Sequence, residues 1–126
     1  MPSLEQIIAI GEKYDDRIRP FIEKANNCDI NDLYLDESSS IGYTLKALSA
    51  GLWAYFNAPD FNTGILRVVN EGGDADSNAC VAGSLLGAKY GFNSIPEKYV
   101  EGLRNKSFLE SKFNAFIEST KGIYVK

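Results

Sequence analysis

The 126-residue sequence contains no histidine and only two cysteines, Cys28 and Cys80. The absence of histidine excludes imidazole catalysis, a Ser-His triad and a His-ligated zinc ion. Any acid–base chemistry must therefore come from carboxylates, tyrosine, lysine, cysteine or metal-bound water. Cys80 falls within a helical segment of small residues, which favours a buried thiol over a disulfide or a nucleophile.

Basic residues and long apolar runs are also scarce. The sequence has thirteen Lys and Arg residues and seventeen Asp and Glu residues, which gives a net charge of −4. This balance argues against sequence-independent nucleic-acid binding, because such binding needs basic side chains that neutralise phosphates. No apolar run is long enough to cross a bilayer, and the N-terminus lacks the basic start and apolar stretch of a signal peptide. We therefore expect a cytoplasmic protein that binds neither nucleic acid nor membrane.

Apolar residues spaced three and four apart predict helices along most of the chain. The periodic segments are residues 4–25, 41–56, 61–69, 77–90, 95–103 and 108–117. Pro20 should kink or break the first segment near Arg19. We find no convincing strand, because the apolar stretch at 123–125 is short and terminal. The pattern predicts an all-α fold, with residues 1–126 in a single domain.

Polar residues gather between these helices. Residues 26–40 form a long loop rich in aspartate and serine, and loops of this length in compact domains are often functional. Asp60 is placed to cap the helix that follows it, and Asp76 and Ser77 are good N-cap residues for the next one.

A stripe of small residues, Ala79, Gly83 and Gly87, runs along the segment after Ser77 at intervals of four. Glycine inside a helix costs about 1 kcal/mol relative to alanine. Close approach of a neighbouring helix would offset that cost, so the stripe predicts tight helix packing on this face.

The loop between the third and fourth long helices holds the densest group of candidate ligands. Gly72-Gly73-Asp74-Ala75-Asp76-Ser77 places two carboxylates and a hydroxyl within four positions. Oxygen ligands at this density suit a hard cation such as Mg²⁺. A turn followed by a helix cap explains the same residues, and caps are commoner than metal sites. Three side-chain ligands fill about half of an octahedral shell, so the loop alone predicts weak metal binding.

Further features accompany this loop in register along the chain. They are the small-residue helix 79–88, Gly91 and Ile95-Pro96 downstream, and Gly42-Tyr43 with Leu52-Trp53-Ala54 upstream. With the motif Gly72-Gly73-Asp74-x-Asp76-Ser77, residues 42–103 resemble the ADP-ribosylglycohydrolase family. Gly-Gly-Asp alone would be weak support, whereas the whole set in register over about half the chain is specific.

The resemblance implies an all-α, ADP-ribosylglycohydrolase-like helical bundle of which this chain is the C-terminal half only. It also implies Mg²⁺-assisted hydrolysis of the glycosidic bond between ADP-ribose and a protein side chain or a small acceptor. By similarity, the metal ligands are Asp74, Asp76 and Ser77, and the two aspartates are also the candidate catalytic residues. The segment that binds ADP-ribose would include Ser40, Gly42 and Tyr43. An aromatic ring can stack on adenine, and hydroxyls with backbone N–H groups suit a diphosphate.

The same resemblance leaves two hypotheses for function. The family also has an N-terminal half with a Gly-Asp segment and a Thr-Asp-Asp triplet that supply the remaining ligands, and we expect both to be absent here. The chain is therefore either a hydrolase completed by a partner half, or a non-catalytic remnant that acts as an ADP-ribose-binding or protein-interaction module. Helix faces that once packed on the lost half predict self-association or a partner chain.

Overall fold

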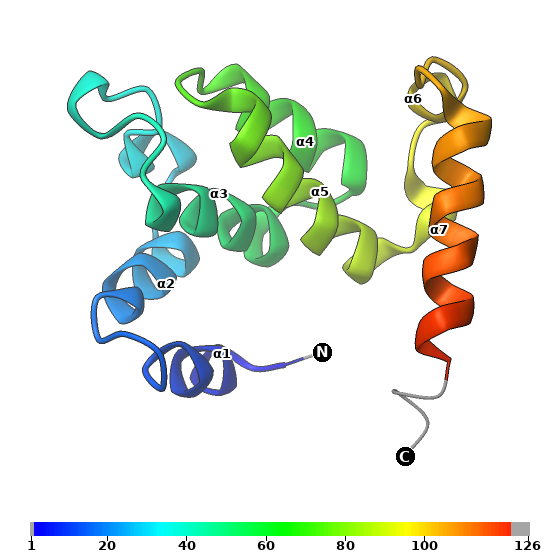
Figure 1. The fold of residues 1–126 in the computed structure, drawn as a ribbon. Helices are drawn as coiled ribbons and strands as arrows, with labels where there is room; N and C mark the ends of the chain where they lie inside the picture. The colour runs from blue at the N-terminus through cyan, green and yellow to red at the C-terminus, as the bar shows by residue number, and fades with distance from the viewer. Residues whose placement is uncertain (1, 122–126) are drawn as a thin grey trace. The chain divides into compact units, whose positions relative to one another are not determined.

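The computed structural model of the chain describes residues 2–121, and these form two compact units. The first unit extends to Ile95 and the second begins at Pro96; each is described by itself. The first unit contains α1 (Leu4–Gly11), α2 (Ile18–Asn27), α3 (Thr44–Asn57), α4 (Phe61–Asn70) and α5 (Ala75–Tyr90), with short 3₁₀ turns between them (Figure 1). The described residues contain helices and no strand, which confirms the predicted all-α fold.

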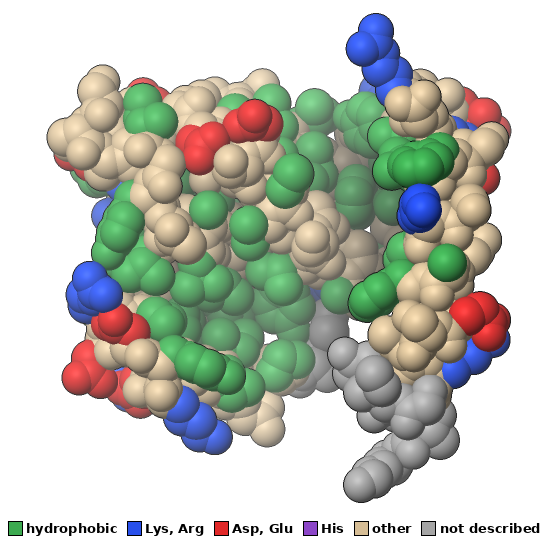
Figure 2. Space-filling view, viewed as in Figure 1, with side chains coloured by type: hydrophobic (Ala, Val, Ile, Leu, Met, Phe, Trp, Pro, Cys, Tyr) green, Lys and Arg blue, Asp and Glu red, His purple; other side chains and the backbone are tan. Residues whose placement is uncertain are grey.

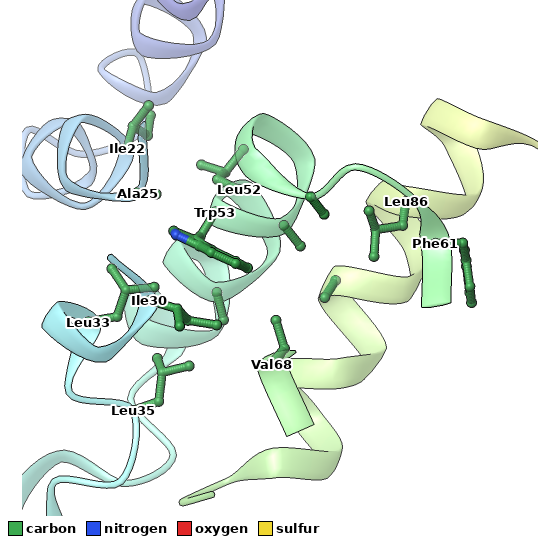
Figure 3. Close-up of a cluster of buried hydrophobic side chains, with 14 of the residues drawn as sticks. Ile22, Ala25, Ile30, Leu33, Leu35, Leu52, Trp53, Phe61, Val68 and Leu86 are labelled. Atoms are coloured by element: carbon green, nitrogen blue, oxygen red, sulfur yellow. The ribbon is translucent and has the colours of Figure 1, made fainter. Parts of the chain in front are cut away.

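The core of the first unit forms where α3 packs against α2 and α5, and α4 against α5. Trp53 of α3 lies near its centre, buried, with its indole N–H donated to the Cys28 carbonyl at 3.2 Å. Figure 3 shows buried apolar side chains from α2, the loop after it, α3, α4 and α5 in this core. The labelled members of this cluster include Ile22, Ile30, Leu33, Leu35, Leu52, Phe61, Val68 and Leu86.

The predicted long polar loop is anchored in this core. It contains the 3₁₀ turns η1 (Ile30–Leu33) and η2 (Ser38–Ser40), and its side chains Ile30, Leu33 and Leu35 are buried. Burial of three apolar side chains fixes the path of the loop between α2 and α3. These buried side chains therefore hold the polar residues of the loop in fixed positions at the edge of the core.

The break in the first helical segment lies earlier than predicted. Helix α1 ends at Gly11 and α2 begins at Ile18, so Pro20 is the third residue of α2 and does not break a helix near Arg19. Proline is tolerated there because N–H groups in the first turn have no intrahelical partner. Asp15 closes the intervening turn by accepting hydrogen bonds from the Arg17 backbone N–H at 2.9 Å and from its guanidinium at 2.7 Å.

The two predicted helix caps have different outcomes. Asp60 caps α4 as predicted, because its carboxylate accepts the Thr63 backbone N–H at 2.7 Å and the Thr63 hydroxyl at 2.8 Å. For α5 the prediction was wrong. Its N-cap residue is Asp74, which makes no side-chain capping hydrogen bond, while Asp76 and Ser77 lie within the first turn.

The small-residue stripe of α5 is not where the helices approach most closely. A Cβ on Gly83 would meet its nearest neighbour at 3.4 Å, and one on Gly87 would meet nothing within 4 Å. The close contacts come from the partner helices: a Cβ on Gly51 of α3 or on Gly64 of α4 would lie 2.7 Å from an α5 side chain. The prediction that the Cys80 thiol is buried is also wrong, because Cys80 is exposed on α5.

The second unit contains α6 (Glu97–Glu101) and α7 (Lys106–Thr120). A 2.6 Å ion pair between Lys106 and Glu101 joins the two helices. Apolar side chains are visible on this unit in the space-filling view (Figure 2), and the exposed ones on α7 are Phe108, Leu109, Phe113, Phe116 and Ile117. The short apolar stretch at 123–125 lies outside the described residues. Within residues 2–121, no helix has the length and apolarity needed to cross a membrane.

Candidate metal and substrate site

The candidate metal loop connects α4 to α5 through two glycines in the left-handed region. Gly72 has φ 74° and Gly73 has φ 62°, values that side chains other than glycine rarely adopt. Gly73 also lies directly against the long loop, because a Cβ there would fall 2.1 Å from the Leu35 carbonyl oxygen and 3.0 Å from Asp36 Cα. The metal loop is therefore in backbone contact with the segment that follows η1.

A second contact joins the candidate metal loop to the candidate substrate segment. Gly42 has φ 78°, and a Cβ at this position would lie 3.7 Å from Oδ2 of Asp74. These two residues are 32 positions apart in the sequence, and the structure places them side by side. Residues assigned by resemblance to metal binding and to ADP-ribose binding thus share one surface of the first unit, although their roles stay predictions.

The carboxyl groups of Asp74 and Asp76 are in contact with each other. Asp76 Oδ1 accepts the Ser77 backbone N–H at 2.9 Å. This hydrogen bond, together with a side-chain hydrogen bond to Asp74, lowers the pKa of Asp76. Neighbouring carboxylates repel each other when both are charged, and a nearby cation relieves that repulsion. Within residues 2–121, no group of three or more His, Cys, Asp or Glu side chains is arranged to hold a metal ion.

Ser77 contributes to this pair through its backbone rather than through its hydroxyl. Its side chain is exposed in the first turn of α5, beside the Asp76 carboxylate that its N–H contacts. Two carboxylates and one hydroxyl at a single helix start are hard oxygen donors, which is the chemistry that Mg²⁺ prefers. The partial positive charge of the helix N-terminus favours the carboxylates but opposes a cation.

Two further carboxylates that the sequence did not single out lie near this loop. Asp36 faces the glycine turn, with its Cβ 3.9 Å from the position that a Cβ on Gly72 would take. Burial raises the pKa of Glu71, and the charges of Asp29 and Asp36 raise it further. No periodicity or spacing links Asp36 to residue 72, so only the fold reveals that this end of the unit is acidic.

The two remaining candidate substrate residues are engaged within the loop itself. The Ser40 hydroxyl donates to Glu37 at 2.7 Å. The Tyr43 ring packs edge-on against Phe21 of α2, with ring centroids 5.8 Å apart, and 40% of its surface stays exposed. Both side chains therefore have structural partners, and Tyr43 keeps enough exposed surface for a ring to stack on it.

Known proteins of related sequence place the chain in a family. The family model described as ADP-ribosylglycohydrolase matches residues 3–123. An uncharacterized protein of Archaeoglobus fulgidus is 37% identical over 111 residues, which cover 85% of this chain and 35% of that relative. The ADP-ribosylarginine hydrolase Tri1 of Serratia proteamaculans is 41% identical over 68 residues, 54% of this chain and 19% of its own length.

A third relative also matches part of the chain. The ADP-ribosyl-[dinitrogen reductase] glycohydrolase of Rhodospirillum rubrum is 34% identical over 70 residues, which cover 56% of this chain and 24% of that protein. The chain therefore spans between 19% and 35% of the length of these three relatives. No solved structure matches the chain.

Proposed function

The chain belongs to the ADP-ribosylglycohydrolase family, and we propose that it supplies the C-terminal half of that fold for Mg²⁺-assisted hydrolysis of ADP-ribose glycosidic bonds. A partner half would complete the site. The observation that supports this proposal is the proximity of Gly42 to Asp74: a Cβ on Gly42 would lie 3.7 Å from Asp74 Oδ2, so the candidate substrate segment and the candidate metal loop are neighbours. The whole reaction is a proposal because the chain spans only 19% to 35% of the length of these relatives.

The residues of the metal loop fit a magnesium ion in part. Asp74, Asp76 and Ser77 would hold it, since a cation would relieve the contact between the two carboxylates and the hydroxyl is exposed beside them. Three ligands leave about half of an octahedral shell for water, substrate and the partner half. Bound there, Mg²⁺ would supply Lewis acidity toward the hydroxyl groups of the substrate ribose.

The chain's own residues have two tasks in this proposal. Asp74 or Asp76 would accept a proton from the attacking water, as a carboxylate base does in glycoside hydrolysis. The segment from Ser40 to Tyr43 would bind ADP-ribose, with the Tyr43 ring against adenine and backbone N–H groups near the diphosphate. Gly42 would let the substrate approach Asp74 because it has no side chain in between.

The acceptor to test first is ADP-ribosylated arginine. Relatives from Serratia proteamaculans and Pseudomonas putida carry the name ADP-ribosylarginine hydrolase, and they are 41% and 44% identical to this chain over the matched residues. These matches extend over 68 and 66 residues, which are 54% and 52% of this chain. We therefore propose the arginine linkage as the substrate class.

Calorimetric titration with MgCl₂, and then with ADP-ribose in the presence of Mg²⁺, tests the proposal. We expect binding of both by the wild-type chain, and at least ten-fold weaker Mg²⁺ binding by Asp74→Asn and Asp76→Asn. The matched control is Asp60→Asn, which removes the same charge at the start of α4 and should leave Mg²⁺ binding unchanged. Absence of Mg²⁺ and ADP-ribose binding at millimolar concentrations would refute the proposed site.

A non-catalytic module is the second candidate, and a specific observation favours it. Five apolar side chains of α7 are exposed: Phe108, Leu109, Phe113, Phe116 and Ile117. In that case the chain would bind ADP-ribose or a protein without hydrolysis, and the apolar side chains of α7 would serve association. ADP-ribose binding that persists in EDTA, or self-association seen by sedimentation, would favour this module over the hydrolase.

A further inference from the structure

We propose that Lys46 is a positioning residue that holds the candidate substrate segment against the metal loop. The inference concerns the same surface as the proposed function and rests on it for its link to ligand binding. Lys46 lies in the first turn of α3, and its side chain is only 11% exposed although lysines are usually solvated. A buried ammonium needs partners, and its partners here both belong to the long loop.

The ammonium group of Lys46 contacts that loop at two points. It donates to the Tyr34 carbonyl oxygen and, at 2.9 Å, to the Glu37 carboxylate. Glu37 also accepts the Ser40 hydroxyl at 2.7 Å, so a single carboxylate joins Lys46 to the candidate substrate segment. The hydrogen bonds from Ser40 and Lys46 lower the pKa of Glu37, which keeps the carboxylate charged and these contacts intact near neutral pH.

Backbone hydrogen bonds close this arrangement into a ring. The Tyr43 N–H donates to the Ser40 carbonyl at 3.1 Å, and the Lys46 N–H donates to the Tyr43 carbonyl at 2.8 Å. The ring therefore runs from Lys46 through Glu37, Ser40 and Tyr43 back to Lys46. We call this ring the Lys46 clamp. Gly42 lies inside the clamped segment and has few ways to move independently of it.

The segment held by the Lys46 clamp contacts the metal loop both before and after Glu37 in the sequence. Before it, the Leu35 carbonyl and the Asp36 backbone lie against Gly73. After it, Gly42 lies against the Asp74 carboxylate. Lys46 fixes the middle of this segment, and both ends of the segment touch the metal loop. Loss of the Lys46 side chain should therefore also change the position of Asp74. Release of the clamp should therefore loosen the start of α5 as well as the loop.

Amide hydrogen exchange on the ligand-free chain tests the clamp without reference to function. Lys46→Met keeps the aliphatic stem and removes the donors. We expect at least five-fold faster exchange in the loop, reported by the Ser40 N–H, and in the metal loop, reported by the N–H of Gly72 and of Asn78, which donate to Val69 and Asp74. The N–H of Ala58, bonded to Ala54 at the end of α3, should change less than two-fold.

Two further variants separate positioning from general stability. Lys46→Arg keeps the charge and the donors and should restore exchange at Gly72 and Asn78 to within two-fold of the wild-type rate. Lys106→Met removes an ion pair of similar length, 2.6 Å to Glu101, and should leave both reporters unchanged. If Lys46→Met speeds exchange at Ala58 as much as at Asn78, or leaves Gly72 and Asn78 unchanged, the positioning role is wrong.

Titration of the same variants with MgCl₂ links the clamp to the proposed site. We expect Mg²⁺ to bind Lys46→Met at least five-fold more weakly than the wild-type chain, with recovery in Lys46→Arg. An unchanged affinity would overturn the link between clamp and site. If the wild-type chain itself binds no Mg²⁺, the proposed function fails, whereas the exchange measurements still decide whether Lys46 positions the loop.

Discussion

Replacement of Gly73 by alanine should force apart the two loops of the candidate site. The added Cβ would lie 2.1 Å from the Leu35 carbonyl oxygen, 2.8 Å from its carbonyl carbon and 3.0 Å from Asp36 Cα. All three atoms belong to the backbone, which cannot rotate aside as the end of a side chain can. The long loop would therefore have to move by roughly an ångström to restore van der Waals contact.

The size of the effect follows from two separate costs. An alanine at φ 62° loses about 1–2 kcal/mol because the left-handed region brings Cβ close to the carbonyl oxygen. Overpacking against a fixed backbone adds about 1–3 kcal/mol. Gly73→Ala should therefore lower the free energy of unfolding by about 2–5 kcal/mol. Gly72→Ala is the matched control: its φ is 74°, but its nearest contact is 3.9 Å away, so only the first cost applies.

Urea unfolding followed by tryptophan fluorescence measures this difference directly. Trp53 is the single tryptophan of the chain and is buried in the core of the first unit, so its emission reports the unfolding of that unit. We expect Gly73→Ala to cost about 1–3 kcal/mol more than Gly72→Ala. Equal losses in the two variants would refute the contact between Gly73 and the long loop, since backbone strain alone would then explain both.

Two other predictions concern helix packing and capping. Gly87→Ala should raise the free energy of unfolding by about 0.5–1 kcal/mol, because alanine favours the helix and no atom lies within 4 Å. Gly51→Ala has the same helix preference, but its Cβ would lie 2.7 Å from Val81, so overpacking should leave a net destabilisation of up to about 2 kcal/mol. Similar effects in both variants, measured by urea unfolding, would contradict the packing of α3 on α5. For Asp60, the Thr63 hydrogen bonds lower the pKa below its ordinary value of 3.8, so its stabilising effect is complete above that value and is lost as pH falls through the lowered pKa. The difference in unfolding free energy between the wild-type chain and Asp60→Asn should therefore shrink between about pH 5 and pH 2, and a constant difference would count against the cap.

Local rules account for the helices that the sequence predicted. The spacing of apolar residues at three and four positions predicted the helical segments. The Asp60 cap could also be predicted, because its hydrogen-bond partner is only three residues further on. The break near Pro20 was misplaced for an equally local reason. Proline excludes the interior of a helix but not its first turn, and the sequence alone does not say which turn contains residue 20.

Contacts between segments that are distant in the sequence could not be predicted from the periodicity of apolar residues. The stripe of Gly83 and Gly87 pointed to α5 as a site of close packing, but the glycines in close contact are Gly51 and Gly64 on its neighbours. Close helix packing can need a small residue on either of the two helices, and only the fold shows which helix carries it. Lys46 was overlooked because its partners lie 9 and 12 residues away, across a turn.

The geometry of the metal loop bears on the choice between a helix cap and a ligand site. A cap would require Asp74 or Asp76 to accept hydrogen bonds from the N–H groups two or three residues further on. Asp74 makes no such bond, and Asp76 accepts the N–H of its immediate neighbour, Ser77. The two carboxyl groups contact each other instead, beside a glycine that leaves space at Asp74. Capping therefore does not account for Asp74, which makes Asp74→Asn the most informative variant for the proposed function.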